Sequence, residues 1–175
     1  TILVTLGGVD AGNVTGALLD GLAELPLPAA TGIDVVMGAT APWRDAVTAR
    51  AATMPNPTRV HTNVTDMAGL MARADLAIGA AGSTAWERCC LGLPSLMVVI
   101  ADNQREIAKG LSAAGAAITL GRPEQADFVL RLRTAILALL ESPQGLLALS
   151  EAAARITDGS GAMRVARAML EISAP

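Results

Sequence analysis

Two glycine-containing loops hold the residues of this sequence that are best suited to chemistry. The first glycine loop spans residues 7–13 (GGVDAGN), and the second glycine loop spans residues 79–84 (GAAGST). Each loop follows an apolar run with the length of a buried strand and precedes a run with the period of a helix. In an open parallel sheet such loops line the crevice where ligands bind, and amides at a helix start favour anions. The two loops therefore predict a site for a ligand that carries phosphate.

The second glycine loop leads into a predicted helix with one early carboxylate, Glu87. Gly82 lets a ligand approach the main chain closely, and Ser83 or Thr84 can cap the helix. The structural alternative is a capped helix in which Glu87 only favours the positive end of the helix dipole. Both interpretations fit this stretch when it is taken alone.

The first glycine loop lacks the dinucleotide-binding fingerprint. A G-x-G-x-x-G pattern is not satisfied from Gly7 or from Gly8, and the second predicted strand ends at Gly38 without an acidic residue to hold an adenosine ribose. The loop can still direct amides at a diphosphate while Asp10 or Asn13 caps the next helix. It can equally be a structural turn, but a nicotinamide cofactor is disfavoured.

A third polar segment, residues 101–106 (ADNQRE), follows the most apolar predicted strand. We expect Asn103 and Gln104 to point into the same crevice as Gly82 and Glu87. Carboxylate and carboxamide groups together commonly hold sugar hydroxyls, because they supply both donors and acceptors. The alternative is that this segment simply caps a helix.

Other reactive side chains give weaker signals. His61 is the only histidine, so neither a metal site nor a hydrolase with Ser83 as nucleophile has the partners it needs. Cys89 and Cys90 are adjacent on a predicted helix, where neighbouring side chains diverge. We therefore expect them to be buried apolar residues rather than a disulfide. No resident cofactor or metal is predicted.

The composition is typical of one domain with a large core. The chain has 175 residues, of which 52% are hydrophobic, and a net charge of -3. With two tryptophans and one phenylalanine, it has neither the basic surface nor the stacking groups that nucleic acid needs. No apolar run is long enough for a membrane span and no signal-like segment opens the chain, so we expect a cytoplasmic location. Because Thr1 leads directly into a strand, we expect a fragment of a longer protein.

Strands and helices are predicted to alternate along the chain. The expected strands are residues 2–6, 33–38, 59–62, 76–80, 95–100 and 116–120. The expected helices are residues 14–25, 43–53, 65–73, 84–91, 103–114, 124–140, 144–157 and 162–172. This alternation is typical of the α/β class, with a doubly wound parallel sheet of Rossmann type and about six strands.

These motifs together resemble the C-terminal, nucleotide-binding half of the GT-B superfamily, in the branch with the UDP-N-acetylglucosamine transferase of peptidoglycan synthesis. The resemblance covers nearly the whole chain. It is carried by Asp66-Met67, residues 74–78, Gly82, Glu87, Gly92-Leu93-Pro94 and Asn103-Gln104. It implies that residues 1–175 form one UDP-binding domain and that an N-terminal domain, absent from this chain, is its partner.

More narrowly, both glycine loops with residues 86–94 (WERCCLGLP) and 101–104 (ADNQ) resemble the UDP-sugar hydrolases of pseudaminic acid biosynthesis. The transferase branch has serine and glutamine where this chain has Val9 and Asp10. The hydrolases act on UDP-2,4-diacetamido-2,4,6-trideoxy-β-L-altropyranose by water attack at the anomeric carbon, which releases UDP and the free sugar. Their proposed general base is a histidine of the N-terminal half, and nothing in this chain matches its setting.

The resemblance implies a set of substrate-binding residues, which are Gly8, Val64, Gly82, Ser83, Thr84, Glu87, Asn103 and Gln104. The ribose hydroxyls would bind Glu87, and the uracil edge would meet main-chain groups near Val64. Both glycine loops would face the diphosphate, and Asn103 with Gln104 would face the sugar. The helix dipole would stabilise the UDP leaving group without a metal. The alternatives are a GT-B glycosyltransferase domain and a non-catalytic nucleotide-sugar-binding module.

Overall fold

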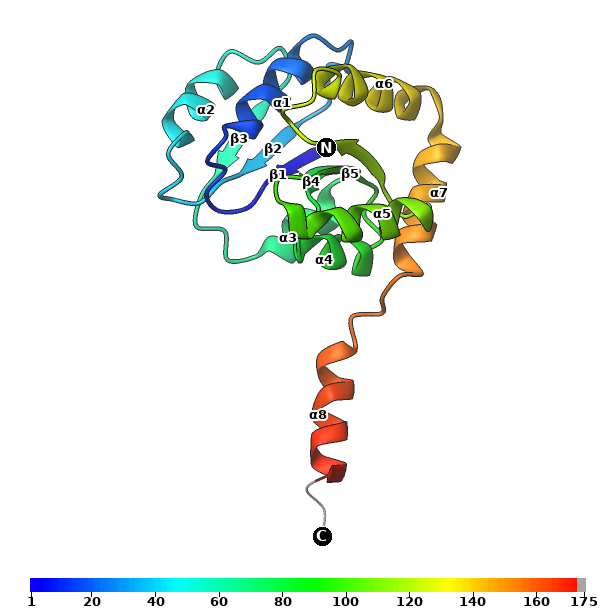
Figure 1. The fold of residues 1–175 in the computed structure, drawn as a ribbon. Helices are drawn as coiled ribbons and strands as arrows, with labels where there is room; N and C mark the ends of the chain where they lie inside the picture. The colour runs from blue at the N-terminus through cyan, green and yellow to red at the C-terminus, as the bar shows by residue number, and fades with distance from the viewer. Residues whose placement is uncertain (173–175) are drawn as a thin grey trace.

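The computed structural model describes the backbone of residues 1–172 and forms a six-stranded sheet between two layers of helices (Figure 1). The strand order is β3-β2-β1-β4-β5-β6, and every neighbouring pair runs parallel. The strands are β1 Ile2–Thr5, β2 Ile33–Val36, β3 Thr58–His61, β4 Leu76–Ala80, β5 Ser95–Val98 and β6 Ile118–Gly121. The α/β class and the doubly wound parallel sheet of six strands are thus confirmed.

Helices cover both faces of the sheet (Figure 1). One face carries α1 (Val14–Ala23), α2 (Arg44–Ala51) and α6 (Phe128–Glu141), and the other carries α3 (Met67–Arg73), α4 (Thr84–Cys90) and α5 (Arg105–Ala113). At the side, α7 (Pro143–Ala154) packs against α4 and α6. Within residues 1–172, every helix is too short or too polar to cross a membrane.

The apolar runs of the central strands explain their place in the sheet. Every residue of β1, β4 and β5 is buried, because helices cover both faces of these strands. The larger core lies between the sheet and α1, α2 and α6, and includes Leu18 and Leu132. A second core, which includes Cys89, Leu111 and Ala153, joins the sheet to α4, α5 and α7. The central strands are therefore packed between apolar side chains on both faces.

Four helices begin later than the sequence predicts; α2 and α3 do so by one and two residues, and α5 and α6 begin after a turn of different structure. The helix expected from residue 103 starts as a 3-10 turn, Asp102–Gln104, and becomes α-helical at Arg105. The helix expected from residue 124 begins at Phe128. Before it, Gly121 has a φ of +87°, and the Gln125 side chain accepts a hydrogen bond from the Arg122 N–H (2.7 Å). Such local side-chain bonds compete with helix formation, and apolar periodicity does not reveal them.

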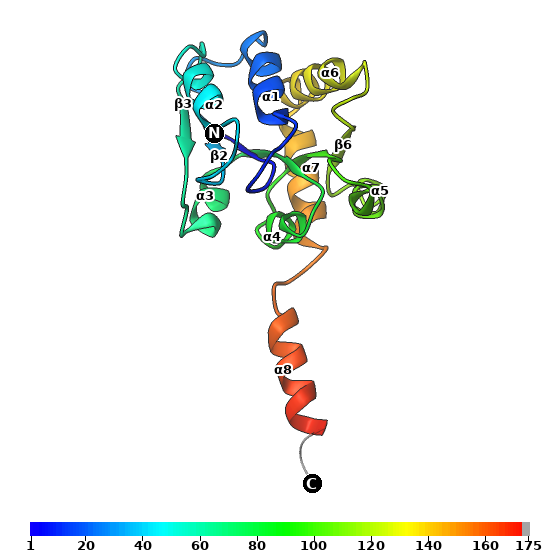
Figure 2. The same ribbon diagram turned by 60° about the vertical axis from the view of Figure 1, so that its left-hand side comes forward.

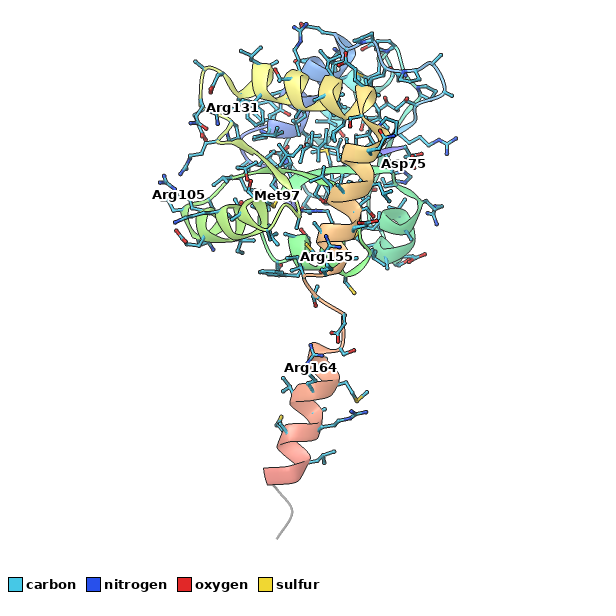
Figure 3. The ribbon with its side chains drawn as sticks, turned by 90° about the vertical axis from the view of Figure 1, so that its right-hand side faces the viewer. Asp75, Met97, Arg105, Arg131, Arg155 and Arg164 are labelled. Carbon is cyan, nitrogen blue, oxygen red and sulfur yellow. The ribbon has the colours of Figure 1, made fainter. Side chains whose placement is uncertain are left out.

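The last helix, α8 (Gly161–Ile172), stands apart from the rest of the domain (Figures 1 and 2). At its base the Arg164 guanidinium donates hydrogen bonds of 2.8 and 3.1 Å to Asp158. These bonds are the main reason that the pKa of Asp158 falls to about 2. Figure 3 shows Arg164 beyond Arg155, the residue that follows α7, on the side away from the sheet. Residues 161–170 of this helix are all exposed.

The first glycine loop packs against the end of β2 through Gly38. A Cβ atom at position 38 would overlap the carbonyl oxygen of Gly8. Since the obstacle is main chain rather than a flexible side chain, no small adjustment can relieve the overlap. Glycine at position 38 therefore sets the position of the first glycine loop.

We expect Gly38→Ala to lower the free energy of unfolding by about 1–3 kcal/mol, because the loop must shift to accept the new methyl group. Urea unfolding measures this change. Gly110→Ala is the matched control, because a Cβ there meets no atom within 4 Å. The control should be neutral or slightly stabilising, since alanine favours the helix interior. Equal midpoints for Gly38→Ala and the native chain would contradict the prediction.

Candidate functional site

The strand order reverses between β1 and β4, and both glycine loops leave the sheet at this point. β1 pairs with β4 in parallel, with Thr5 opposite Gly79. The chain continues from β1 toward β2 on one side and from β4 toward β5 on the other. Since both strands end at the same edge, their loops flank one crevice, which is the usual ligand site of an open α/β sheet. The structure therefore brings together the two loops that the sequence singles out.

Three side chains hold the first glycine loop in one conformation. The buried Asp10 carboxylate accepts hydrogen bonds from the first N–H groups of α1, those of Val14 and Thr15 (both 2.9 Å). The Asn13 side chain accepts a further bond from the same turn (3.3 Å). The Trp43 indole donates to a carbonyl of the loop (2.9 Å). The loop is thus fixed to both α1 and the start of α2.

This capping changes what the first glycine loop can offer an anion. The sequence leaves open whether Asp10 or Asn13 caps α1, and in the structure both side chains do so. The first-turn amides of α1 already have partners, one of which is a carboxylate. An anion at this loop must therefore bind amides of residues 7–12 rather than the helix start.

The second glycine loop is built differently. Ser83 is the N-cap residue of α4, but its side chain makes no capping hydrogen bond. Its φ of −57° and ψ of −33° are helical, whereas a capping side chain reaches the first-turn amides from an extended backbone. Thr84 Oγ1 instead accepts a hydrogen bond from Arg88 (3.3 Å). The expectation that Ser83 or Thr84 caps this helix is wrong, and its first turn has no side-chain cap.

Arg88 lies beneath the second glycine loop, and sequence reasoning assigned it no role. It is 1% exposed; its Nη2 donates to the Ala80 carbonyl (2.9 Å) and its Nε donates to Ser95 Oγ (3.2 Å). Burial lowers the pKa of Arg88 to about 10, and the nearby Cys89 and Glu87 oppose that shift. The guanidinium therefore stays charged at neutral pH. Its position as the one charged residue on the apolar face of a short predicted helix is the sequence signal that could have identified Arg88.

Glu87 is exposed at the start of α4 and lines a cavity of about 510 Å³ between α3 and α4. Ala68 and Met71 of α3 form one wall, and Trp86 forms part of the other. Residues of the segment 157–162 close one end. Mostly apolar walls with one carboxylate suit a flat ring that carries hydroxyl groups at one edge.

The structure also brings the third polar segment to the second glycine loop. The Gln104 Nε2 atom lies 3.6 Å from the place that a Cβ of Gly82 would occupy. The Gln104 Oε1 atom accepts a hydrogen bond from the N–H of Ile100 (3.0 Å), so its orientation is fixed. Asn103 is exposed beside it. The amide group of Gln104 thus faces the loop, as the sequence predicts.

Gly8 and Glu87 line different cavities. Gly8 is exposed in a cavity of about 420 Å³ that Ile100 and Pro123 also line. Val64 is half-buried, three positions after β3. A ligand that touches both Gly8 and Glu87 must therefore be elongated, as a nucleoside diphosphate is.

Outside the crevice, His61 ends β3 and pairs with Asp34 of β2, with 2.6 Å between Nε2 and Oδ1. Cys89 is buried as expected, but the same expectation is wrong for Cys90, which is exposed. Adjacent helix residues point about 100° apart, so only one of the two can face the core. In the described part of the chain, no three potential metal ligands lie together.

The fold and the crevice define this chain as an open, Rossmann-like α/β domain. MurG of Acinetobacter baumannii has the same fold, with a TM-score of 0.77 over 97% of this chain and 51% of that protein, at 22% identity. Residues 1–165 match the glycosyltransferase family 28 C-terminal domain. The chain belongs to this family.

Two curated relatives illustrate the breadth of the family. The spore coat polysaccharide biosynthesis protein SpsG of Bacillus subtilis is 32% identical over 165 residues, which are 94% of this chain and 48% of the relative. The UDP-N-acetylglucosamine--N-acetylmuramyl-(pentapeptide) pyrophosphoryl-undecaprenol N-acetylglucosamine transferase of Xylella fastidiosa is 35% identical over 120 residues, which are 66% of this chain and 33% of the relative. The chain thus spans about half the length of the first relative and about a third of the second.

We expect Asp10→Ala to lower the free energy of unfolding by about 2 kcal/mol, because two amides of α1 lose their acceptor. Alanine also disfavours the left-handed φ of +43° at this position. Asp10→Asn is the control: it keeps one acceptor oxygen and tolerates this backbone, so it should lose less. Urea unfolding of both variants checks the order, and equal losses would contradict the capping role.

Proposed function

We propose that this chain is the domain that binds the UDP-sugar donor of a family 28 glycosyltransferase. The observation that carries the proposal is the family match combined with two glycine loops at the switch point of the sheet. The Xylella fastidiosa relative is named as a transferase of N-acetylglucosamine from its UDP derivative. By that similarity we take UDP as the nucleotide and leave the sugar open.

Two glycines support a diphosphate between the loops. Neither Gly8 nor Gly82 has a positive φ. A Cβ at Gly8 would meet no atom within 4 Å, and one at Gly82 would make only ordinary contact with Gln104. The fold therefore does not require glycine at either position. A ligand that lies directly against the main chain gives a reason for both.

The remaining proposed contacts assign each part of a UDP-sugar to residues of the crevice. Glu87 binds the ribose hydroxyls in the cavity between α3 and α4, and the main chain near Val64 meets the uracil edge. The diphosphate lies against Gly8 on one side and against residues 82–84 on the other. Asn103 and Gln104 face the sugar. Ser83 and Thr84 contribute chiefly through their amides, since the Thr84 hydroxyl is bonded to Arg88.

A transferase and a hydrolase would use this site alike, because both break the bond between the anomeric carbon and the diphosphate. The family match and the transferase relative favour transfer to an acceptor. They give no support to the hydrolase of pseudaminic acid biosynthesis that the sequence motifs resemble. We therefore propose a transferase rather than a hydrolase, with the acceptor hydroxyl in place of water.

The acceptor site and the remaining catalytic groups are proposed to lie in a second domain. This chain covers 48% of the Bacillus subtilis relative, which leaves room for such a domain in proteins of this kind. On α8, Val165 is 61% exposed and Leu170 is 73% exposed. We propose that these apolar side chains pack against the second domain.

We expect Glu87→Gln to weaken UDP binding about tenfold or more, because a charge-assisted hydrogen bond to the ribose is lost. Isothermal titration calorimetry with UDP measures the loss. Glu106→Gln removes a first-turn carboxylate from α5 and controls for the helix dipole. If UDP affinity is unchanged in Glu87→Gln, this carboxylate acts only on the dipole and its proposed role is wrong.

We expect Gly82→Ala to keep the native melting temperature but to weaken UDP binding, since its methyl group fits the fold and would meet the diphosphate. Thermal melting and calorimetry on one preparation separate the two effects. Gly110→Ala serves again as the control: it should leave UDP affinity unchanged and should not lower the melting temperature. If Gly82→Ala binds UDP with native affinity, the diphosphate does not lie against this loop.

A protein that joins this domain to a second domain distinguishes the two reactions. Incubated with a UDP-sugar, a transferase should release UDP at a rate that rises strongly when the sugar acceptor is present. Proton NMR of the anomeric signal follows product and stereochemistry together. Rapid UDP release with water alone, unchanged by acceptors, would restore the hydrolase interpretation.

A further inference from the structure

We propose that Arg88 is a positioning residue: its hydrogen bonds hold the second glycine loop in place, and its buried charge favours the binding of a diphosphate at that loop. This inference rests on the proposed function, which assigns the diphosphate to that loop. It is carried by the surroundings of the guanidinium group.

Several residues make room for the guanidinium group of Arg88 or accept its hydrogen bonds. A Cβ at Gly79 would lie 2.6 Å from Nη1 of Arg88, so the central strand β4 lacks a side chain where the cation lies. The Ala80 carbonyl accepts from Nη2, Ser95 Oγ accepts from Nε, and Thr84 Oγ1 accepts from Nη1. These contacts come from β4, β5 and α4. The sheet and α4 thus provide both space and hydrogen-bond acceptors for this cation beneath the crevice.

All three acceptors are neutral. Within the described residues, Arg88 forms no ion pair, although Glu87 is its neighbour in sequence. Burying a cation without a carboxylate partner is costly, even when its hydrogen bonds are satisfied. An anion that binds close by in the functional state gives a physical reason to keep this charge.

The contacts of Arg88 also place it at both ends of the second glycine loop. It bonds to Ala80, where β4 ends, and to Thr84, where α4 begins. Residues 81–83 are therefore held between two fixed points. At the low effective dielectric of a buried site, its charge acts on a diphosphate more strongly than an exposed charge would. Arg88 thus both shapes the loop and favours an anionic ligand over a neutral one.

The test compares UDP, uridine and inorganic pyrophosphate as ligands of the native chain, Arg88→Gln and Arg88→Lys, by calorimetry. Arg88→Gln should bind UDP and pyrophosphate about tenfold more weakly, and uridine within about twofold of the native chain. Arg88→Lys keeps the charge and should recover most of the UDP affinity. Arg131→Gln removes an exposed charge from α6 (Figure 3) and should change none of the three.

If Arg88→Gln does not fold, Arg88→Lys carries the test. It loses the forked hydrogen bonds but should bind UDP within about threefold of the native chain. Equal losses for UDP and uridine, in either variant, would mean a structural role only and would overturn the inference. So would undiminished UDP and pyrophosphate binding in folded Arg88→Gln.

The native chain separates this inference from the proposed function. Binding of pyrophosphate without UDP, with the loss in Arg88→Gln, would overturn the UDP assignment and leave the role of Arg88 standing. If the native chain binds UDP and Arg88→Gln binds it equally well, the role of Arg88 is overturned and the UDP assignment stands. A native chain that binds neither UDP nor pyrophosphate would overturn both.

Discussion

The parallel pairing of β1 with β4 is the constraint on which the rest of the structure depends. It makes these two strands the centre of the sheet, so both must be apolar on both faces. It also makes the chain turn in opposite directions from the two strands, which opens a crevice at their carboxyl ends. Two loops that lie some seventy residues apart in sequence, near Gly8 and Gly82, thereby become neighbours.

The two helix starts beside this crevice differ in their electrostatics. At α1 the Asp10 carboxylate occupies the first amides, so negative charge is already present there. At α4 no side chain caps the first turn, and the Arg88 cation lies beneath it. The contrast favours an anionic group on the β4 side of the crevice and a closer role for main-chain amides on the β1 side. It also fits an elongated ligand whose neutral end lies near Glu87.

The family match and the fold agree on what this domain is, whereas the proposed reaction also needs groups that we place in a second domain. A crevice between two domains is a common place for a substrate, and in the proposed function this chain would supply one wall of such a crevice. α8 leaves the domain with apolar residues such as Val165 exposed. In the proposed function a second domain would cover this helix and bury those apolar side chains. Transfer and hydrolysis differ only in the group that attacks the anomeric carbon, and that group would come from the other wall.

The sequence by itself determined the α/β class, the order of strands and helices, and the two loops, because apolar periodicity and glycine placement are local signals. It missed the late start of α6 and the lack of a side-chain cap on α4, and it left open which of Asp10 and Asn13 caps α1. These features depend on individual side-chain bonds, such as those of Gln125 and Thr84. Only the tertiary structure decided that Gly38 must be glycine and that Arg88 lies buried against Gly79. The first arises from a contact between two loops that are distant in sequence, and the second from the packing of α4 against β4 and β5. Apolar periodicity contains neither contact.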